Sequence, residues 1–154
     1  MSLIDRVRGA SPEELWSYHT RTLTYITFKR YTFVDPTERT ANYLTAVYNS
    51  FTLTAPVDRA LWILGISFTR EMRVDGGTAE SRLQFDSNPI DGYGSTSSIT
   101  YVIVRTHTWA GFYVEPGASI TIRILFRNAS PSTPNTTFMR NVRVEVLYAE
   151  VEVL

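Results

Sequence analysis

Cysteine is absent from this chain of 154 residues, and histidine occurs only at His19 and His107. Without cysteine the chain has neither disulfides nor thiolate ligands. With only two histidines, a zinc site built from histidine and carboxylate ligands alone is not expected. No apolar run reaches the roughly 18 residues that a membrane-spanning helix needs. The sequence therefore predicts neither a zinc site nor a membrane span.

The chain also lacks an excess of charge of either sign, because it has 15 basic and 15 acidic residues. Proteins that bind nucleic acids or anionic membranes without sequence preference carry a basic field, so we expect neither partner. Lys29 is the only lysine. The dominance of arginine suits ion pairs at protein interfaces, although a GC-rich genome, such as that of a thermophile, is the simpler interpretation.

Residues 1–20 are interpreted as a charged arm followed by a short helix. The arm carries Arg6 and Arg8 where a secretory signal would need an apolar stretch, so no signal peptide is predicted. The segment Ser11-Pro12-Glu13-Glu14 has the order of a helix start: a serine N-cap, a proline in the first turn and acidic residues near the positive end of the dipole. We expect the helix to include Trp16 and to end near His19.

From residue 21 onward the pattern is typical of strands alone. Alternating apolar residues form seven runs, or eight to nine if breaks in phase are counted as strand changes, at residues 23–33, 43–53, 61–74, 83–85, 99–109, 120–126 and 138–154. Two runs have doubly apolar centres, which indicates two packed sheets. Residues 21–154 are therefore predicted to form a single all-β domain, an antiparallel β-sandwich.

The connections between these strands are expected to gather in two sets, because antiparallel strands reverse direction at each turn. Residues 88–97 (NPIDGYGSTS) have the composition of a loop. The resulting prediction places residues 35–40, 75–78 and 109–117 at one end of the sandwich, and residues 55–59, 88–97 and 129–137 at the other.

The last seventeen residues, 138–154, contain a change of phase. Val142, Val144 and Val146 share one parity, whereas Val151 and Val153 share the other. A slip of one residue moves every side chain to the opposite face of a sheet. We expect a bulge, a strand that passes from one sheet to another, or a strand that crosses to a neighbouring subunit.

No constellation in the sequence indicates catalysis, so an enzyme is not expected. His107 stands between two threonines in a strand, in parity with Trp109, and is interpreted as an outward strand residue. The segment 92–95 (Gly-Tyr-Gly-Ser) has the glycines of a phosphate cradle but neither its lysine nor its helix. No catalytic, metal or cofactor residue is assigned.

The sequence WAGFYVEPG at residues 109–117 is predicted to be an aromatic loop, and its side chains are better suited to binding than those of the other connections. Trp109, Phe112 and Tyr113 could anchor a protein interface, stack on a sugar ring or cap the core. An interface is favoured over a sugar site, because the segment itself supplies few convergent polar groups beyond Glu115.

Three segments resemble the jelly-roll capsid and capsid-decorating proteins of icosahedral viruses: the arm at 1–10, FTLTAP at 51–56 and VEPGASITIRILF at 114–126. The resemblance implies a jelly-roll-like β-sandwich and a structural virion protein that self-assembles and contacts other virion proteins. The arm is less basic than in many such proteins, which does not favour genome contact.

These observations lead to one set of interface residues and one alternative. The residues expected to contact a second copy are Arg6, Arg8, Trp16, Trp109, Phe112, Tyr113, Val151 and Val153. Val151 and Val153 are expected to extend a sheet edge or to pair with a neighbour. The alternative is a carbohydrate- or receptor-binding β-sandwich in which Trp109, Phe112 or Tyr93 is exposed to a glycan.

Overall fold

The computed structural model describes residues 26–86, 88–131 and 135–152, with the backbone alone for residues 88–91 and 110. The predicted arm and helix at 1–20 lie outside these ranges. Four predicted interface residues, Arg6, Arg8, Trp16 and Val153, lie outside them as well, so their roles stay predictions. The described residues contain strands and turns and no helix, which confirms an all-β fold for this part of the chain.

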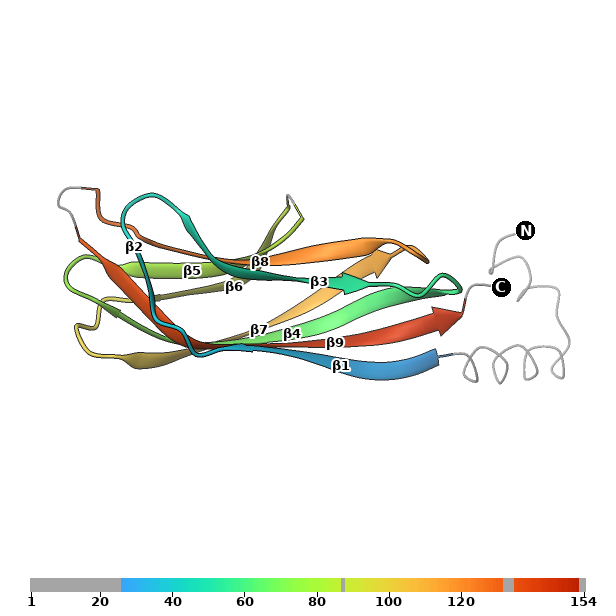
Figure 1. The fold of residues 1–154 in the computed structure, drawn as a ribbon. Helices are drawn as coiled ribbons and strands as arrows, with labels where there is room; N and C mark the ends of the chain where they lie inside the picture. Colours follow the sequence, from blue (N-terminus) through green and yellow to red (C-terminus); the bar gives the residue numbers. More distant parts are fainter. Residues whose placement is uncertain (1–25, 87, 132–134, 153–154) are drawn as a thin grey trace, which may run out of the picture.

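The described chain forms two antiparallel sheets that pack face to face (Figure 1). Nine strands build them: β1 (Ile26–Asp35), β2 (Arg39–Ala41), β3 (Ala46–Thr54), β4 (Arg59–Val74), β5 (Ala79–Phe85), β6 (Asn88–Thr96), β7 (Val102–Val114), β8 (Ser119–Asn128) and β9 (Thr137–Glu152). The first sheet has the order β1-β9-β4-β7, with β2 also paired to β9, and the second has the order β3-β8-β5-β6. The predicted sandwich is confirmed at this level.

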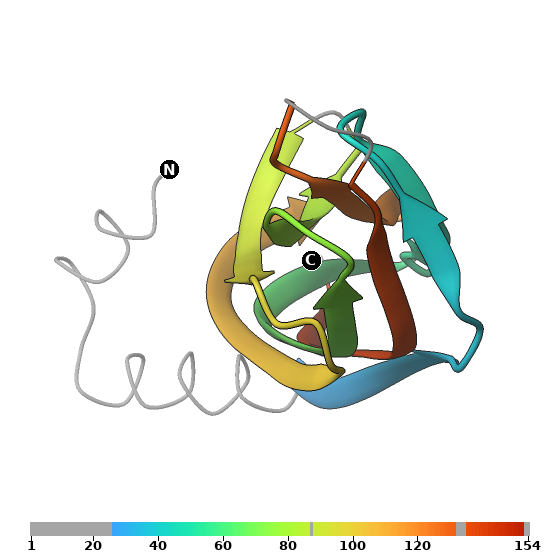
Figure 2. The same cartoon turned by 90° about the vertical axis from the view of Figure 1, so that its left-hand side faces the viewer.

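The strand order follows a single rule. Apart from the short β2, each strand pairs with its counterpart counted from the other end of the chain: β1 with β9, β3 with β8, β4 with β7, and β5 with β6. Two of these pairs lie in each sheet. Figure 2, which looks along the strands, shows the strands closing around a common core.

The core lies between the sheets and follows the predicted alternation. Ile122 and Ile124 of β8 and Val144 and Val146 of β9 are completely buried. Phe33 of β1 stacks on Phe51 of β3, with ring centroids 5.0 Å apart. Each buried side chain of this size contributes roughly 1.5–3 kcal/mol relative to an exposed one.

The prediction of a loop at residues 88–97 is wrong, because this segment contains strand β6. Its two internal glycines suggest a loop, but Gly92 adopts a φ of 87° and Gly94 leaves room for a buried side chain of β4. Because this strand was not predicted, each connection that follows it lies at the end of the sandwich opposite to the predicted one. Ala55 donates to the carbonyl of Ala118 over 2.8 Å, so 55–58 and 115–118 share one end; Asp75 donates to Thr136, so 75–78 and 129–136 share the other.

The change of phase in β9 does not move the strand out of its sheet. The register with β1 is unbroken from Val142 to Val151, and the irregularity opposite the phase change lies in the neighbouring strand β4, between Ile63 and Gly65. A second irregularity, between Thr69 and Glu71 of β4, lies opposite the first half of β9 and away from the phase change. β9 therefore lies between β1 and β4 as a central strand. Val151 pairs with Ile26 on one side and Ala60 on the other, so the prediction that it extends a sheet edge is wrong.

The buried carboxylate of Glu150 accounts for the altered pattern near the end of β9. It accepts hydrogen bonds from Lys29 (2.8 Å) and Arg59 (3.0 Å), one from each neighbouring strand. These bonds, the one from Lys29 foremost, lower the pKa of Glu150 despite its burial. An acidic residue thus occupies a buried position, and sequence periodicity misreads it as an outward one.

Candidate functional site

An aromatic face covers one end of the outer surface of the first sheet. Phe28, Ala149, Trp62 and Tyr113 pair in succession across β1, β9, β4 and β7, and Leu147, Gly65 and Trp109 form the next row. Because paired residues project from the same side of a sheet, these side chains lie beside one another. We define the aromatic face by its five large exposed members: Phe28, Trp62, Trp109, Tyr113 and Leu147.

The aromatic face exposes a large area of apolar surface to solvent. Trp109 is 85% exposed, and the other four members are each more than a third exposed. At roughly 200 Å² per large side chain, the face presents roughly 600 Å² to solvent. This is at the upper end of the largest apolar patches on monomeric proteins, and such patches commonly mark interaction sites.

A row of polar side chains borders the aromatic face on the same sheet. His107 forms a 2.7 Å hydrogen bond with Ser67, and Arg143 pairs with Glu145 over 2.6 Å. A shallow hollow of about 180 Å³ lies between this row and Trp109, with Arg30 also in its wall. The face therefore has an apolar centre and a charged border that carries both signs.

Residues 109–114 of the predicted aromatic loop belong to strand β7, so the loop prediction is wrong there, and the aromatic side chains lie in two environments. Trp109 and Tyr113 project from the aromatic face, as expected for interface residues. Phe112 instead turns inward and stacks on Phe85, with centroids 4.9 Å apart and planes at 4°. The prediction that Phe112 is exposed is therefore wrong. Its side chain packs against the core, which is the alternative given above for the aromatic residues.

Sequence reasoning missed three members of the aromatic face. Phe28, Trp62 and Leu147 come from strands far from the segment 109–117, and only the register of the sheet brings them to it. One signal was present, because the run at 61–66 is apolar in both parities. Trp62 takes the outward parity there and Ile63 the inward one.

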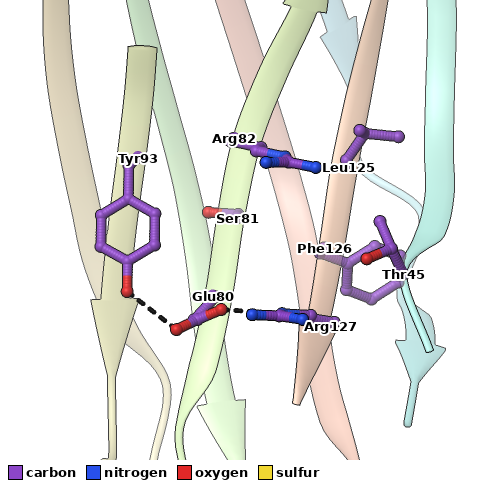
Figure 3. Close-up of a pocket in the computed structure, with 8 residues that line it drawn as sticks. All are labelled: Thr45, Glu80, Ser81, Arg82, Tyr93, Leu125, Phe126 and Arg127. Atoms are coloured by element: carbon purple, nitrogen blue, oxygen red, sulfur yellow. Dashed lines mark hydrogen bonds and ion pairs between the residues drawn. The ribbon is translucent and has the colours of Figure 1, made fainter. Parts of the chain in front are cut away.

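A second, more polar hollow of about 220 Å³ lies on the outer surface of the second sheet (Figure 3). Glu80 of β5 accepts a 2.9 Å hydrogen bond from the Tyr93 hydroxyl and a 2.8 Å bond from Nε of Arg127. We call this hollow on the second sheet the Tyr93 hollow. Arg82 and Leu125 also line it. Burial opposes ionisation of Glu80, but its bonds to Arg127 and Tyr93 outweigh that effect and leave its pKa below the usual value.

Beneath this hollow, Arg70 of β4 is completely buried between the sheets. Its guanidinium donates to Ser81 Oγ (2.8 Å), Thr106 Oγ1 (2.7 Å), and the carbonyls of Phe68 (3.0 Å) and Gly92 (2.9 Å). Burial lowers the pKa of Arg70 to about 9, so the side chain is still a cation at neutral pH. These bonds join β4, β5, β6 and β7.

Arg70 was not predicted to be a buried residue, although the sequence contains a signal for it. The residue has the parity of Phe68, Met72 and Val74, all buried, so an arginine stood in an otherwise apolar inward series. A Cβ at position 94 would lie 2.0 Å from Nη2 of Arg70, which explains why β6 has glycine there. The segment 92–95 thus accommodates a cation of its own chain.

The described residues were compared with the requirements of a metal site and of a membrane-spanning helix. No group of three or more histidine and acidic side chains that could hold a metal ion is found among them. Within the same ranges, no helix is long and apolar enough to cross a membrane. His107 lies on the exposed surface of β7, where its recorded hydrogen bond is to Ser67.

Comparison with known proteins shows similarity in fold alone. No protein-family model matches the chain, and no curated protein matches it in sequence. The VP2 subviral particle of infectious bursal disease virus aligns over 82% of this chain at 12% identity with a TM-score of 0.51. The structure of T=1 particles derived from the same virus aligns over 82% of this chain at 12% identity with a TM-score of 0.52.

The chain spans 36–37% of the length of these viral proteins. A xylan-binding domain from Paenibacillus barcinonensis Xyn10C covers 86% of this chain and 90% of its own at 9% identity, but its TM-score of 0.37 is too low to establish a shared fold. The described part of the chain is therefore a two-sheet β-sandwich with structural similarity to proteins of virus particles.

Proposed function

We propose that this protein is a structural virion protein, a capsid or capsid-associated subunit, and that it acts by self-assembly through the aromatic face. The observation that carries the proposal is the exposure of five large apolar side chains on one sheet surface. The pairing of each strand with its counterpart from the other chain end is the order of a jelly roll. The similarity in fold to proteins of virus particles supports the same proposal.

A second copy of this chain is the partner that the surface fits. Its exposed apolar area, roughly 600 Å², approaches the roughly 800 Å² that each partner buries in a stable interface. The bordering row carries Arg30 and Arg143 together with Glu145. In a two-fold contact, the acid of each copy can face a base of the other. The proposal also places the protein in the virion.

The test is the solution mass of the full chain, measured by light scattering over a range of concentrations. Wild-type protein is expected to form oligomers, and the double variant Trp62→Ser/Trp109→Ser is expected to be monomeric. Tyr93→Ser is the matched control, since it removes an exposed aromatic residue from the other sheet. Circular dichroism verifies that both variants are folded. A monomeric wild type, or an oligomer that the double variant leaves intact, would refute the proposal.

Saccharide binding is a second candidate function, and the Tyr93 hollow is the observation that favours it. An exposed aromatic ring beside a carboxylate and two arginines provides both a stacking surface and hydrogen-bonding groups for sugar hydroxyls. Binding of oligosaccharides to the wild-type protein, with loss in Tyr93→Ala, tests this candidate. A variant that binds as well as the wild type would exclude this hollow as the site.

A further inference from the structure

The Tyr93 hollow lies in a local excess of positive charge. In the pairing of β5 with β8, Glu80 is opposite Arg127, Arg82 is opposite Leu125, and Gln84 is opposite Arg123. Three arginines and one glutamate thus occupy successive outward positions on two adjacent strands. This arrangement gives a surplus of two positive charges, on a chain whose formal net charge is zero.

Two of the three arginines form no ion pair with a carboxylate of the described residues. Arg127 is neutralised by Glu80, whereas none of the ion pairs of the described residues contains Arg82 or Arg123. Figure 3 shows Arg82 reaching from β5 toward β8, beside Leu125. Guanidinium groups present paired N–H donors that match carboxylate and sulfate oxygens.

The ring of Tyr93 is held in place before any ligand arrives. Its hydroxyl is fixed by Glu80, and Figure 3 shows the ring face-on above β6. The residue is 54% exposed. On the buried side, Arg70 binds the carbonyl of Gly92 and fills the space left by Gly94, the two residues that flank Tyr93. A fixed aromatic surface of this kind lowers the entropy cost of stacking.

We propose that the Tyr93 hollow binds an acidic saccharide, one that carries a carboxylate or a sulfate. The sugar ring stacks on Tyr93, a sugar hydroxyl donates to Glu80, and the anionic group pairs with Arg82 and, just outside the lining of the hollow, with Arg123. This inference rests on saccharide binding, the second function proposed above. The volume of about 220 Å³ admits a ring-sized group and is smaller than the roughly 300 Å³ of ordinary small-molecule pockets.

Glu80 favours a saccharide over a nucleic acid. A nucleic-acid strand would bring a phosphate for every stacked base to a hollow with a carboxylate at its centre, and the surplus of two positive charges offsets few phosphates. Sugar hydroxyls instead can donate to a carboxylate. The hollow and the aromatic face lie on the outer surfaces of different sheets. Contact with a second copy through the aromatic face therefore leaves the Tyr93 hollow accessible to a ligand.

The test uses the full chain and three oligosaccharide probes in titration calorimetry: a heparin-derived sulfated hexasaccharide, a hexagalacturonate that carries carboxylates, and neutral maltohexaose. At least one acidic probe is expected to bind, with affinity that falls as salt is added. The comparison of sulfate with carboxylate identifies which anion is preferred. Arg82→Gln/Arg123→Gln is expected to weaken binding about tenfold or more, and the matched surface variant Arg105→Gln on β7 is expected to have no effect.

The outcomes separate this inference from the function on which it rests. If maltohexaose binds as tightly as the acidic probes and salt has no effect, the acidic ligand is refuted while saccharide binding stands. If none of the probes binds to folded protein, both are refuted. Tighter binding of a single-stranded oligodeoxythymidine would overturn the inference in favour of a nucleic-acid surface.

Discussion

Replacement of Arg70 by methionine tests whether the buried guanidinium network stabilises the sandwich. Methionine is unbranched and of similar length, so it fills most of the same space, and the substitution removes the hydrogen-bond donors without a large cavity. Four acceptors lose their donor: Ser81 Oγ, Thr106 Oγ1 and the carbonyls of Phe68 and Gly92.

The expected loss follows from which acceptors can find another partner. Ser81 already lies 3.3 Å from Met72 Sδ, and the Thr106 hydroxyl lies 3.2 Å from the Gly92 carbonyl. Apart from the backbone bonds of the sheet, the Phe68 carbonyl keeps a 3.5 Å contact with that hydroxyl. One or two buried acceptors are thus left poorly bonded, at about 1–3 kcal/mol each. Removal of a desolvated charge offsets part of this cost, so we expect a net loss of about 2–4 kcal/mol.

Urea denaturation followed by tryptophan fluorescence measures this loss. With a slope of about 1–3 kcal/mol/M for a domain of this size, the midpoint should fall by roughly 1–2 M. Arg70→Lys is expected to lie between wild type and Arg70→Met, because lysine keeps the charge but not the fork of donors. Arg105→Met, on the exposed surface of β7, is the control and should change stability by less than about 0.5 kcal/mol.

A midpoint for Arg70→Met equal to or above that of wild type would refute the reasoning. It would mean that the cost of burying the cation exceeds the value of its hydrogen bonds, as happens when some buried ion pairs are replaced by apolar residues. Arg70 would then serve to hold the strands in register, with no net contribution to the free energy of unfolding.

Three further expectations concern packing, pH and the two roles within one aromatic segment. Gly94→Ala should destabilise the protein by about 1–3 kcal/mol in the same urea assay, because its Cβ would collide with the buried guanidinium of Arg70. The control Gly111→Ala, whose Cβ would have no atom within 4 Å, should leave the urea midpoint unchanged. The folded-state pKa of Glu150 is lowered by its two cationic partners, so its stabilising effect is present above the unfolded value and is lost as the pH falls through the folded one. The stability gap between wild type and Glu150→Gln should therefore narrow between neutral pH and about pH 3, and a gap that widens would contradict this assignment. Phe112→Ala should cost about 3 kcal/mol and leave assembly unchanged, whereas Tyr113→Ala should weaken assembly in light scattering and leave the urea midpoint unchanged.

The sheets could be predicted from sequence where each strand buries one regular face. In β8, Ile120, Ile122, Ile124 and Phe126 alternate without a break, and the structure confirms the alternation. β6 was not predicted as a strand, because glycines at this spacing are typical of a turn. In the structure these glycines accommodate the side chain of Arg70 from β4. The periodicity of a strand reports its own two faces and carries no information about a side chain that enters from another strand.

The aromatic face could be predicted only in part, for a related reason. Trp109 and Tyr113 stand in one segment and were found there. The pairing of Trp62 with Tyr113, and of Gly65 with Trp109, depends on an irregular register between β4 and β7. Such a register is set by tertiary packing, so the sequence showed the apolar excess at 61–66 without showing what it faces.

The contrast between Phe112 and Tyr113 bears most directly on function. Adjacent residues of β7 point to opposite sides of the first sheet: Phe112 completes a stack in the core, while Tyr113 joins the exposed row with Trp62. Folding alone accounts for Phe112, because its ring is removed from water within the chain. It does not account for Tyr113, Trp62 or Trp109, whose exposed surface gains little from folding and favours aggregation. A contact made after folding would bury these rings, and in the self-assembly that we propose the partner that carries a matching face is another copy of the same chain.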